Sequence, residues 1–227
     1  MKTKAFGLFA AVTVLAISSS HAMGAVIISE IMFEVAGSDD NREWVELYNT
    51  GNAAVDLSGW RLRDEDAGSQ PGSPLPAGTS LGPKQALVLI ENETTFLGDW
   101  GAGINYMVYP GMGTSLNMAN TPAAPGDEVL TLVDASDVVV DVADYDNESP
   151  WPSVTNATAT SIYVLPGFLS AAANDLGTSW GRSTAGVHGA VLGNNDRTDA
   201  GSPGVVIPEP TTLVLALSVA MFWRRRK

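Results

Sequence analysis

Residues 26–63 read VIISEIMFEVAGSDDNREWVELYNTGNAAVDLSGWRLR, and this stretch decides the fold class. It holds four short runs rich in β-forming residues, separated by turn residues, at 26–33, 43–48, 55–57 and 60–63. In the second run, Val45 and Leu47 alternate with bulkier or charged residues. Such alternation predicts a strand with one face toward an apolar core.

The same pattern continues outward along the chain. Five further short runs follow, at 86–90, 107–109, 129–133, 138–143 and 161–165. The sequence DASD at 134–137 joins two valine-rich runs as a hairpin connection would. No helical period is sustained for ten residues, so the pattern predicts an all-β sandwich.

Several residues of the opening stretch have expected structural roles. Asn49 and Asp56 are predicted to bond nearby backbone groups at turns. Gly59 permits a bend before Trp60, whose indole is expected to fill the core of the sandwich.

Glu46 is an acid inside an otherwise apolar strand. Two interpretations are open for its side chain: it faces solvent, which is the commoner case, or it pairs with Arg61 or Arg63.

Three motifs in this stretch resemble the opening of the lamin-tail domain family: ISEIM at 28–32, EWVELYN at 43–49 and VDLSGW at 55–60. The resemblance implies an immunoglobulin-like β-sandwich, predicted to occupy residues 23–204. It is strongest over 26–145 and looser over the closing strands and loops of 146–204. Bacterial copies often adjoin a nuclease or phosphatase domain, for which this chain leaves no room.

The charge is distributed unevenly. Six of the twelve basic residues lie at the two ends, which leaves six in the middle of the chain against 24 acidic residues, a balance of −18. A surface of this kind repels nucleic acid, so DNA binding by analogy with lamin tails is not expected. The chain has no cysteine, which excludes disulfides and an N-terminal lipid-modified cysteine.

The N-terminus has the features of a secretory signal peptide. Lys2 and Lys4 precede an apolar stretch of 13 residues at 5–17, and small residues follow up to Ala22. We therefore expect residues 1–22 to form a signal peptide that is cleaved after Ala22, with Ala25 as the alternative.

The C-terminus, residues 205–227, resembles a known sorting signal. It contains Pro208-Glu209-Pro210, an apolar segment at 211–223 and a basic end, in that order. The basic end begins with Arg224, Arg225 and Arg226. These three parts resemble the PEP-CTERM signal of Gram-negative bacteria, in which an exosortase separates the tail from the exported domain.

The apolar segment of 13 residues is short against the roughly 20 that span a bilayer. We expect a short hydrophobic helix that holds the precursor in the inner membrane until it is processed, after which the domain reaches the cell surface or the medium. The alternative is an ordinary membrane helix that permanently tethers a periplasmic domain.

A zinc or copper site built from histidine and cysteine is not expected, because the chain has no cysteine and His188 is the only histidine left once the signal peptide is removed. Residues 177–181, GTSWG, match the letters of a hydrolase elbow around Ser179, but the strand and helix that this motif needs do not flank it. The sequence therefore predicts no catalytic residue and no organic cofactor.

Acidic clusters are the remaining candidates for chemistry. The weak calcium candidates are Asp144, Asp146 and Glu148, and further acids lie at 39–40 and 64–66. One such cluster offers only part of the six to eight oxygens that calcium requires. A solvated acidic surface is the plainer interpretation, with structural calcium as the alternative.

The sequence thus predicts a non-catalytic binding or structural module, with an exosortase as its processing partner. Its protein or glycan partner would contact the loops at 37–42, 64–76 and 92–104, the last of which carries Trp100. The competing hypothesis is a secreted glycan hydrolase, which requires two carboxyls about 5 to 10 Å apart in a cleft, one with a raised pKa.

Overall fold

The structure is a computed structural model that describes residues 26–65, 72–113, 116–120, 128–195 and 198–205.

Strand β1 (Val26–Met32) pairs antiparallel with β2 (Trp44–Asn49) at the centre of the domain. Ile28 lies opposite Leu47 and Glu30 opposite Glu46, so the register shifts between Ile28 and Glu30. This β-bulge keeps both apolar residues on one face and both glutamates on the other.

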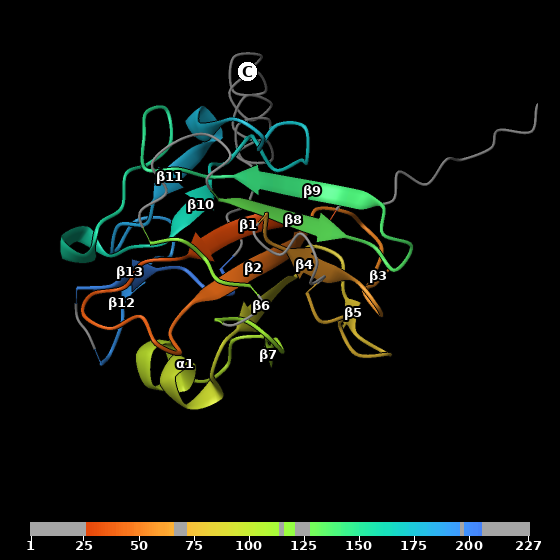
Figure 1. The fold of residues 1–227 in the computed structure, drawn as a ribbon, viewed down its shortest axis with the longest axis horizontal. Helices are drawn as coiled ribbons and strands as arrows, with labels where there is room; N and C mark the ends of the chain where they lie inside the picture. The colour runs from red at the N-terminus through yellow and green to blue at the C-terminus, as the bar shows by residue number, and fades with distance from the viewer. Residues whose placement is uncertain (1–25, 66–71, 114–115, 121–127, 196–197, 206–227) are drawn as a thin grey trace, which may run out of the picture.

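The β1–β2 pair is the middle of a six-stranded sheet whose order is β11-β10-β1-β2-β6-β7 (Figure 1). Its other strands are β6 (Ala86–Ile90), β7 (Tyr106–Val108), β10 (Ile162–Val164) and β11 (Trp180–Arg182). The β6–β7 pair is parallel and the others are antiparallel. Because β10 and β11 extend the sheet beyond β1, residues after 146 belong to the same folded unit as the opening strands.

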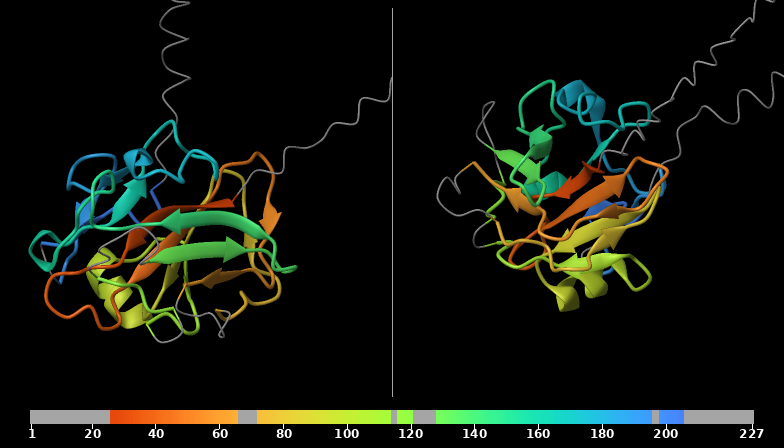
Figure 2. Two further views of the ribbon diagram at one scale, coloured as in Figure 1. Left: turned by 45° about the horizontal axis from the view of Figure 1, so that its top comes forward. Right: turned by 90° about the vertical axis from the view of Figure 1, so that its right-hand side faces the viewer.

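A second sheet covers one face of the first. It consists of β4 (Arg61–Arg63), β8 (Val129–Val133) and β9 (Val139–Asp144), with β8 in the middle. Strands β8 and β9 cross in front of β1 in two different views (Figures 1 and 2). Two small ladders complete the architecture: β3 (Val55–Asp56) with β5 (Ser80–Leu81), and β12 (Val191–Leu192) with β13 (Ala200–Gly201).

The main core lies between these two sheets. Val45, Leu47 and Leu89 of the larger sheet join Leu62 and Leu132 of the smaller one in a single buried cluster. The alternation of residues in the sequence therefore places the aliphatic side chains where the two sheets meet.

The opposite face of the larger sheet is also covered. Trp44, Val88 and Ile90 on that face pack with Phe96 of helix α1 (Glu93–Trp100). The side chain of Asn92 caps this helix by accepting bonds from the amides of residues 94 and 95. Because both faces are covered, even the residues that alternate away from the main core are buried: every residue of β2 is buried.

The structure confirms the mostly β fold and corrects several details. Residues 92–104, predicted as a loop, contain α1, whose eight residues are too few to show a helical period in sequence. Trp60 packs against the main core but is only partly buried, so it borders the core rather than filling it. The turn roles are confirmed: Asn49 bonds the carbonyls of residues 53, 81 and 82, Asp56 accepts the Ser58 amide, and Gly59 has φ of 78°.

Candidate functional site

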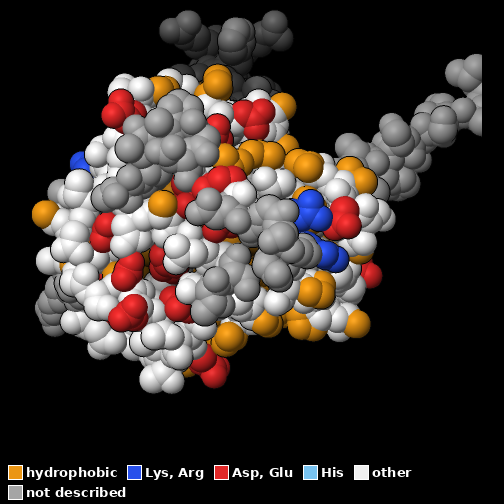
Figure 3. Space-filling view, viewed as in Figure 1, with side chains coloured by type: hydrophobic (Ala, Val, Ile, Leu, Met, Phe, Trp, Pro, Cys, Tyr) orange, Lys and Arg blue, Asp and Glu red, His pale blue; other side chains and the backbone are white. Residues whose placement is uncertain are grey.

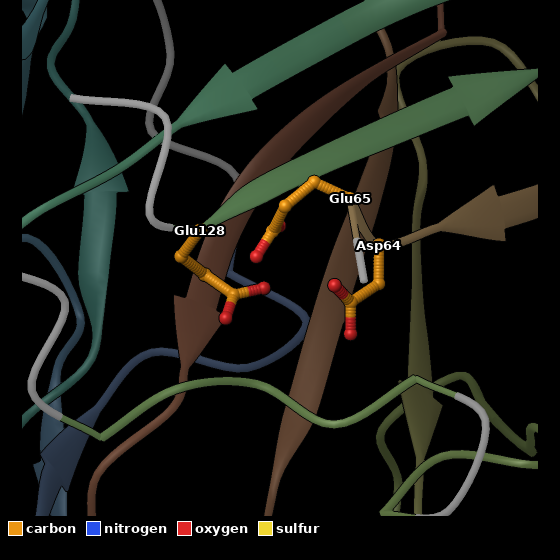
Figure 4. Close-up of side chains that lie close together, drawn as sticks. All are labelled: Asp64, Glu65 and Glu128. Carbon is orange, nitrogen blue, oxygen red and sulfur yellow. The ribbon is translucent and has the colours of Figure 1, made fainter. Parts of the chain in front are cut away.

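Three carboxylates lie together where the smaller sheet meets the loops at one end of the domain. Asp64 and Glu65 follow directly after β4, and Glu128 directly precedes β8. Strands β4 and β8 pair antiparallel, so the end of one lies beside the start of the other. One carboxylate oxygen from each of the three side chains lies within 4.8 Å of the other two. The carboxylates of Asp64 and Glu128 point toward one another (Figure 4).

Backbone amides hold all three side chains in place. Each carboxylate accepts a hydrogen bond from a distant amide: Asp64 from Asn117 at 3.0 Å, Glu65 from Val129 at 2.6 Å and Glu128 from Ala119 at 2.6 Å. Asp64 and Glu128 are buried, at 6% and 2% exposure, whereas Glu65 is exposed. A carboxylate has about four acceptor positions, so an amide bond fixes its orientation and still leaves capacity for a metal ion.

These three residues belong to a wider acidic region. The pKa of Glu43 is raised to about 9, first by burial and then by the negative charges of Glu91, Asp39, Glu128 and Glu34. The pKa values of Glu34 and Glu91 are also raised, first by burial. Figure 3 shows acidic side chains gathered on this face of the molecule, with few basic ones beside them.

A second acidic group, the pair of Glu30 and Glu46, lies on the face of the larger sheet that points away from the main core. Glu30 and Glu46 are each only 2% exposed and lie opposite one another across β1 and β2. Glu30 accepts bonds from the amide and the hydroxyl of Ser202 at 2.8 and 2.7 Å. Glu46 accepts bonds from the hydroxyl of Ser29 at 2.7 Å and the amide of Gly204 at 2.6 Å.

The burial of Glu46 corrects both interpretations of its sequence position. Its side chain neither faces solvent nor pairs with Arg61 or Arg63, both of which bond Asp137. The alternation did place it on the outer face of the sheet, but residues 202–204 cover that face. Such a return of the chain over the sheet is a long-range contact that local sequence does not reveal.

The Glu30–Glu46 pair also bears on the hydrolase hypothesis. Both pKa values are raised, chiefly by burial, and that of Glu46 reaches about 8. The cavity beside the pair has a volume of only about 20 Å³. That space admits a water molecule but not a sugar ring. The Glu30–Glu46 pair has the raised pKa that a glycan hydrolase requires, but it has no room for a glycan.

The three calcium candidates from the sequence are not brought together. Asp146 is buried and accepts the amide of Glu148 at 2.6 Å, which forms a local turn. Among the described residues, the carboxylates that converge closely enough to share a metal are Asp64, Glu65 and Glu128 instead. Glu128 was missed because only the pairing of β4 with β8 brings it to residues 64 and 65.

Ser179 and His188 have different partners. The hydroxyl of Ser179 is buried and donates to the carbonyl of Ala173 at 2.6 Å. His188 is exposed, and its Nδ1 lies 2.8 Å from the hydroxyl of Tyr163. Each residue therefore has a structural contact of its own, and no hydrogen bond joins the two in the described part of the chain.

Side chains of the predicted binding loops also make contacts within the domain. Trp100 packs edge-on against Trp44, with ring centroids 5.8 Å apart, and is partly buried. In the loop at 37–42, Arg42 bonds Asp99 and Asp199 at 3.0 and 2.5 Å. The loop at 64–76 is described except for residues 66–71.

An open groove of about 790 Å³ lies near the end of the domain. It is bordered by the segment at 80–86, the loop at 102–105 and residues 203–205. Lys84 and Asn105 contribute polar groups to its lining.

The segments expected to direct export and sorting lie outside the described residues, except for Val205. They are residues 1–22, with the cleavage site Ala22, and residues 205–227, with Pro208, Glu209 and Pro210. Arg224, Arg225 and Arg226 lie outside the described residues as well. Across the described ranges, no helix has the length and apolar character that crossing a membrane requires.

Comparison with known proteins identifies the family. No curated protein matches the chain. Residues 19–147, more than half of the chain, match the Lamin Tail Domain family. This family has a non-catalytic, immunoglobulin-like fold, in agreement with the two facing sheets of the structure. The chain therefore belongs to the Lamin Tail Domain family.

Proposed function

We propose that this protein is an exported, non-catalytic binding or structural module that an exosortase separates from its C-terminal tail. The non-catalytic character follows the family. The proposal for sorting is supported by the order of Pro208-Glu209-Pro210, an apolar segment and a basic end in the sequence.

The observation that carries the proposal is how the segment at 202–204 is held. Ser202 and Gly204 are bonded to the buried carboxyls of Glu30 and Glu46, which fixes this segment on the larger sheet. Pro208 follows Gly204 by four residues. Cleavage at 208–210 would therefore leave every described strand and hydrogen bond in place, as a module that works after processing requires.

The surface charge supports a role away from nucleic acid. The balance of −18 over the middle of the chain disfavours binding to phosphate backbones and anionic membranes. Contact with the membrane would be confined to the segment at 211–223 before processing. The mature domain would then act at the cell surface or in the medium on a protein or glycan partner.

Intact mass measurements on the protein from the inner membrane, outer surface and medium of its host test the proposal. We expect mature material that lacks residues 1–22 and the stretch after about Pro210. Glu209→Ala should accumulate as the unprocessed precursor in the inner membrane. Glu148→Ala, an exposed substitution elsewhere in the chain, should be processed like the wild type.

Two results would overturn the proposal. Wild-type protein that retains residues 211–227 in the inner membrane would show a permanently tethered periplasmic domain. Normal processing of Glu209→Ala in a host that cleaves the wild type would show that the Pro-Glu-Pro motif does not direct the cleavage.

A further inference from the structure

The cluster of Asp64, Glu65 and Glu128 concentrates negative charge in a partly buried place. Two of its three carboxylates are almost inaccessible to solvent, yet their ligand oxygens lie within 4.8 Å of one another. Buried carboxylates at such a distance repel each other unless protons or a cation compensate their charge.

A buried hydroxyl beside the cluster gives independent support for a ligand. Tyr145 is fully buried, and its hydroxyl has no hydrogen-bond partner among the described residues. Asp144, which precedes Tyr145, pairs with Val129, which follows Glu128, so Tyr145 and Glu128 adjoin the same end of the β8–β9 ladder. Burial raises the pKa of Tyr145 well above its ordinary value, and the charges of Glu128, Glu43, Asp64 and Glu65 contribute in the same direction. Buried hydroxyls nearly always form a hydrogen bond, and a water molecule on a bound cation would supply one.

The described basic side chains are engaged at other places. Arg42 forms ion pairs with Asp99 and Asp199, and Arg61 and Arg63 form ion pairs with Asp137. Lys84 donates a hydrogen bond to the carbonyl of Thr50, and Arg182 donates one to the carbonyl of Ser153. Four other acidic residues, Glu91, Asp39, Glu128 and Glu34, lie near enough to Glu43 to contribute to its raised pKa. The acidic region thus has a local field that attracts cations.

We propose that Asp64, Glu65 and Glu128 bind a calcium ion. The donors are all carboxylate oxygens, which suit hard cations and not zinc or copper. Calcium accepts irregular sets of six to eight oxygens, so water and backbone carbonyls complete its coordination, whereas magnesium demands a near-ideal octahedron. Tyr145 then positions a calcium-bound water through its hydroxyl.

The ion would join parts of the chain that are distant in sequence. Its ligands come from the end of β4 and the start of β8, and two of them also hold the amides of Asn117 and Ala119. Calcium binding would therefore stabilise the smaller sheet together with the segment at 116–120. The site depends on the folded domain alone and not on how the chain is sorted.

The test is calcium titration of the full-length protein, purified in a mild detergent after treatment with EGTA. Calorimetric titration with calcium chloride should show one site, and 1 mM calcium should raise the melting temperature by about 3 to 10 °C over that in EGTA. Magnesium chloride at the same concentration should have a much smaller effect.

Matched variants distinguish this site from other acids. Glu65→Gln (exposed) and Glu128→Gln (buried) should lose the calcium response, while Glu93→Gln (exposed, on α1) and Glu46→Gln (buried, on β2) should keep it. Tyr145→Phe should bind calcium about tenfold more weakly, because it cannot orient the bound water. In EGTA, Glu128→Gln should be at least as stable as the wild type, since it removes a buried charge, so its lost response is not a failure to fold.

Three outcomes would overturn the proposal. The first is a wild-type protein that shows neither heat of binding nor a thermal shift at 5 mM calcium. The second is an unchanged calcium response in Glu65→Gln and Glu128→Gln. The third is an equal response to magnesium, which would refute the assignment to calcium.

Discussion

Glu30 and Glu46 face one another across β1 and β2, and both bind the segment that closes the domain. Each is 2% exposed, and each has a raised pKa because of burial. The charge of Glu30 also raises the pKa of Glu46, which reaches about 8. Since two adjacent buried carboxyls do not both ionise readily, the pair keeps at least one proton near neutral pH.

This pair predicts that the domain is more stable in mild acid than in alkali. The folded-state pKa of Glu46 lies above its ordinary value of 4.5, so the folded state binds more protons than the unfolded state between about 4.5 and 8. Its stabilising contribution is full below that range and is lost as the pH rises through it. Glu43 and Asp141, with pKa values raised to about 9 and 6, act in the same direction.

Urea denaturation in EGTA should therefore give a free energy of unfolding at least about 2 kcal/mol lower at pH 9 than at pH 5. Glu46→Gln mimics the protonated side chain and should reduce this difference. A free energy that rises from pH 5 to pH 9 in the wild type would contradict the protonated pair.

Arg42→Ala should destabilise the domain by about 3 to 5 kcal/mol. The guanidinium joins Asp99 on α1 to Asp199 near β13, and the side chains of these two acids are only 5% and 1% exposed. Its removal would leave two buried carboxylates without their cation. Arg63→Ala is the control, because its partner Asp137 is 56% exposed, and it should cost less than about 1 kcal/mol in the same denaturation experiment.

Tyr109→Phe should cost about 1 to 3 kcal/mol of folding free energy. The hydroxyl of Tyr109 accepts the amide of Leu62 in β4 at 2.9 Å, and both residues are buried. Phenylalanine fills the same space but leaves that amide without an acceptor. Tyr106→Phe loses only an exposed bond to Glu93 and should change the melting temperature little, whereas equal losses in both variants would refute this role.

Asp141→Ala should loosen the contact between the two sheets. Asp141 lies on β9, and its Oδ2 accepts the amide of Ile28 at 2.7 Å and the side chain of Asn174 at 3.0 Å. Ile28 is at the β-bulge of β1, where a shift in register changes the pairing of its amide. The amide hydrogen of Ile28 should therefore exchange faster in the variant, and the free energy of unfolding should fall by about 2 to 4 kcal/mol. Unchanged exchange at Ile28 would show that the carboxylate does not hold the bulge.

The sequence predicted most of the strands because their signal is local. The runs at 26–33, 43–48, 86–90 and 129–133 correspond to β1, β2, β6 and β8. The strands that were missed have only two or three residues, namely β5, β11, β12 and β13. So short a strand has too little alternation of its own, and its partner in the ladder makes it a strand. Strands β3 and β7 are equally short, but they overlap runs that were predicted from their β-forming residues.

The candidate site was predictable only in part. The acids at 64–66 were recognised as a cluster, but the importance of Glu128 and Tyr145 was not, because they lie more than 60 residues away along the chain. The triplet of Asp144, Asp146 and Glu148 looked comparable in sequence, yet Asp146 is turned into a local bond with the amide of Glu148. Proximity in sequence was therefore a poor guide to which carboxylates converge.

The sequence by itself determined the all-β class, the family and the inward face of β2, since period-two alternation is a property of the local backbone. It also determined the overall acidity and the expectation of export and sorting. Only the tertiary structure decided which acids are buried and which converge. Strand pairing and the closing residues 202–204 bring together groups that are far apart along the chain, and the energy of a carboxylate depends on the neighbours and solvent around it, not on its place in the sequence.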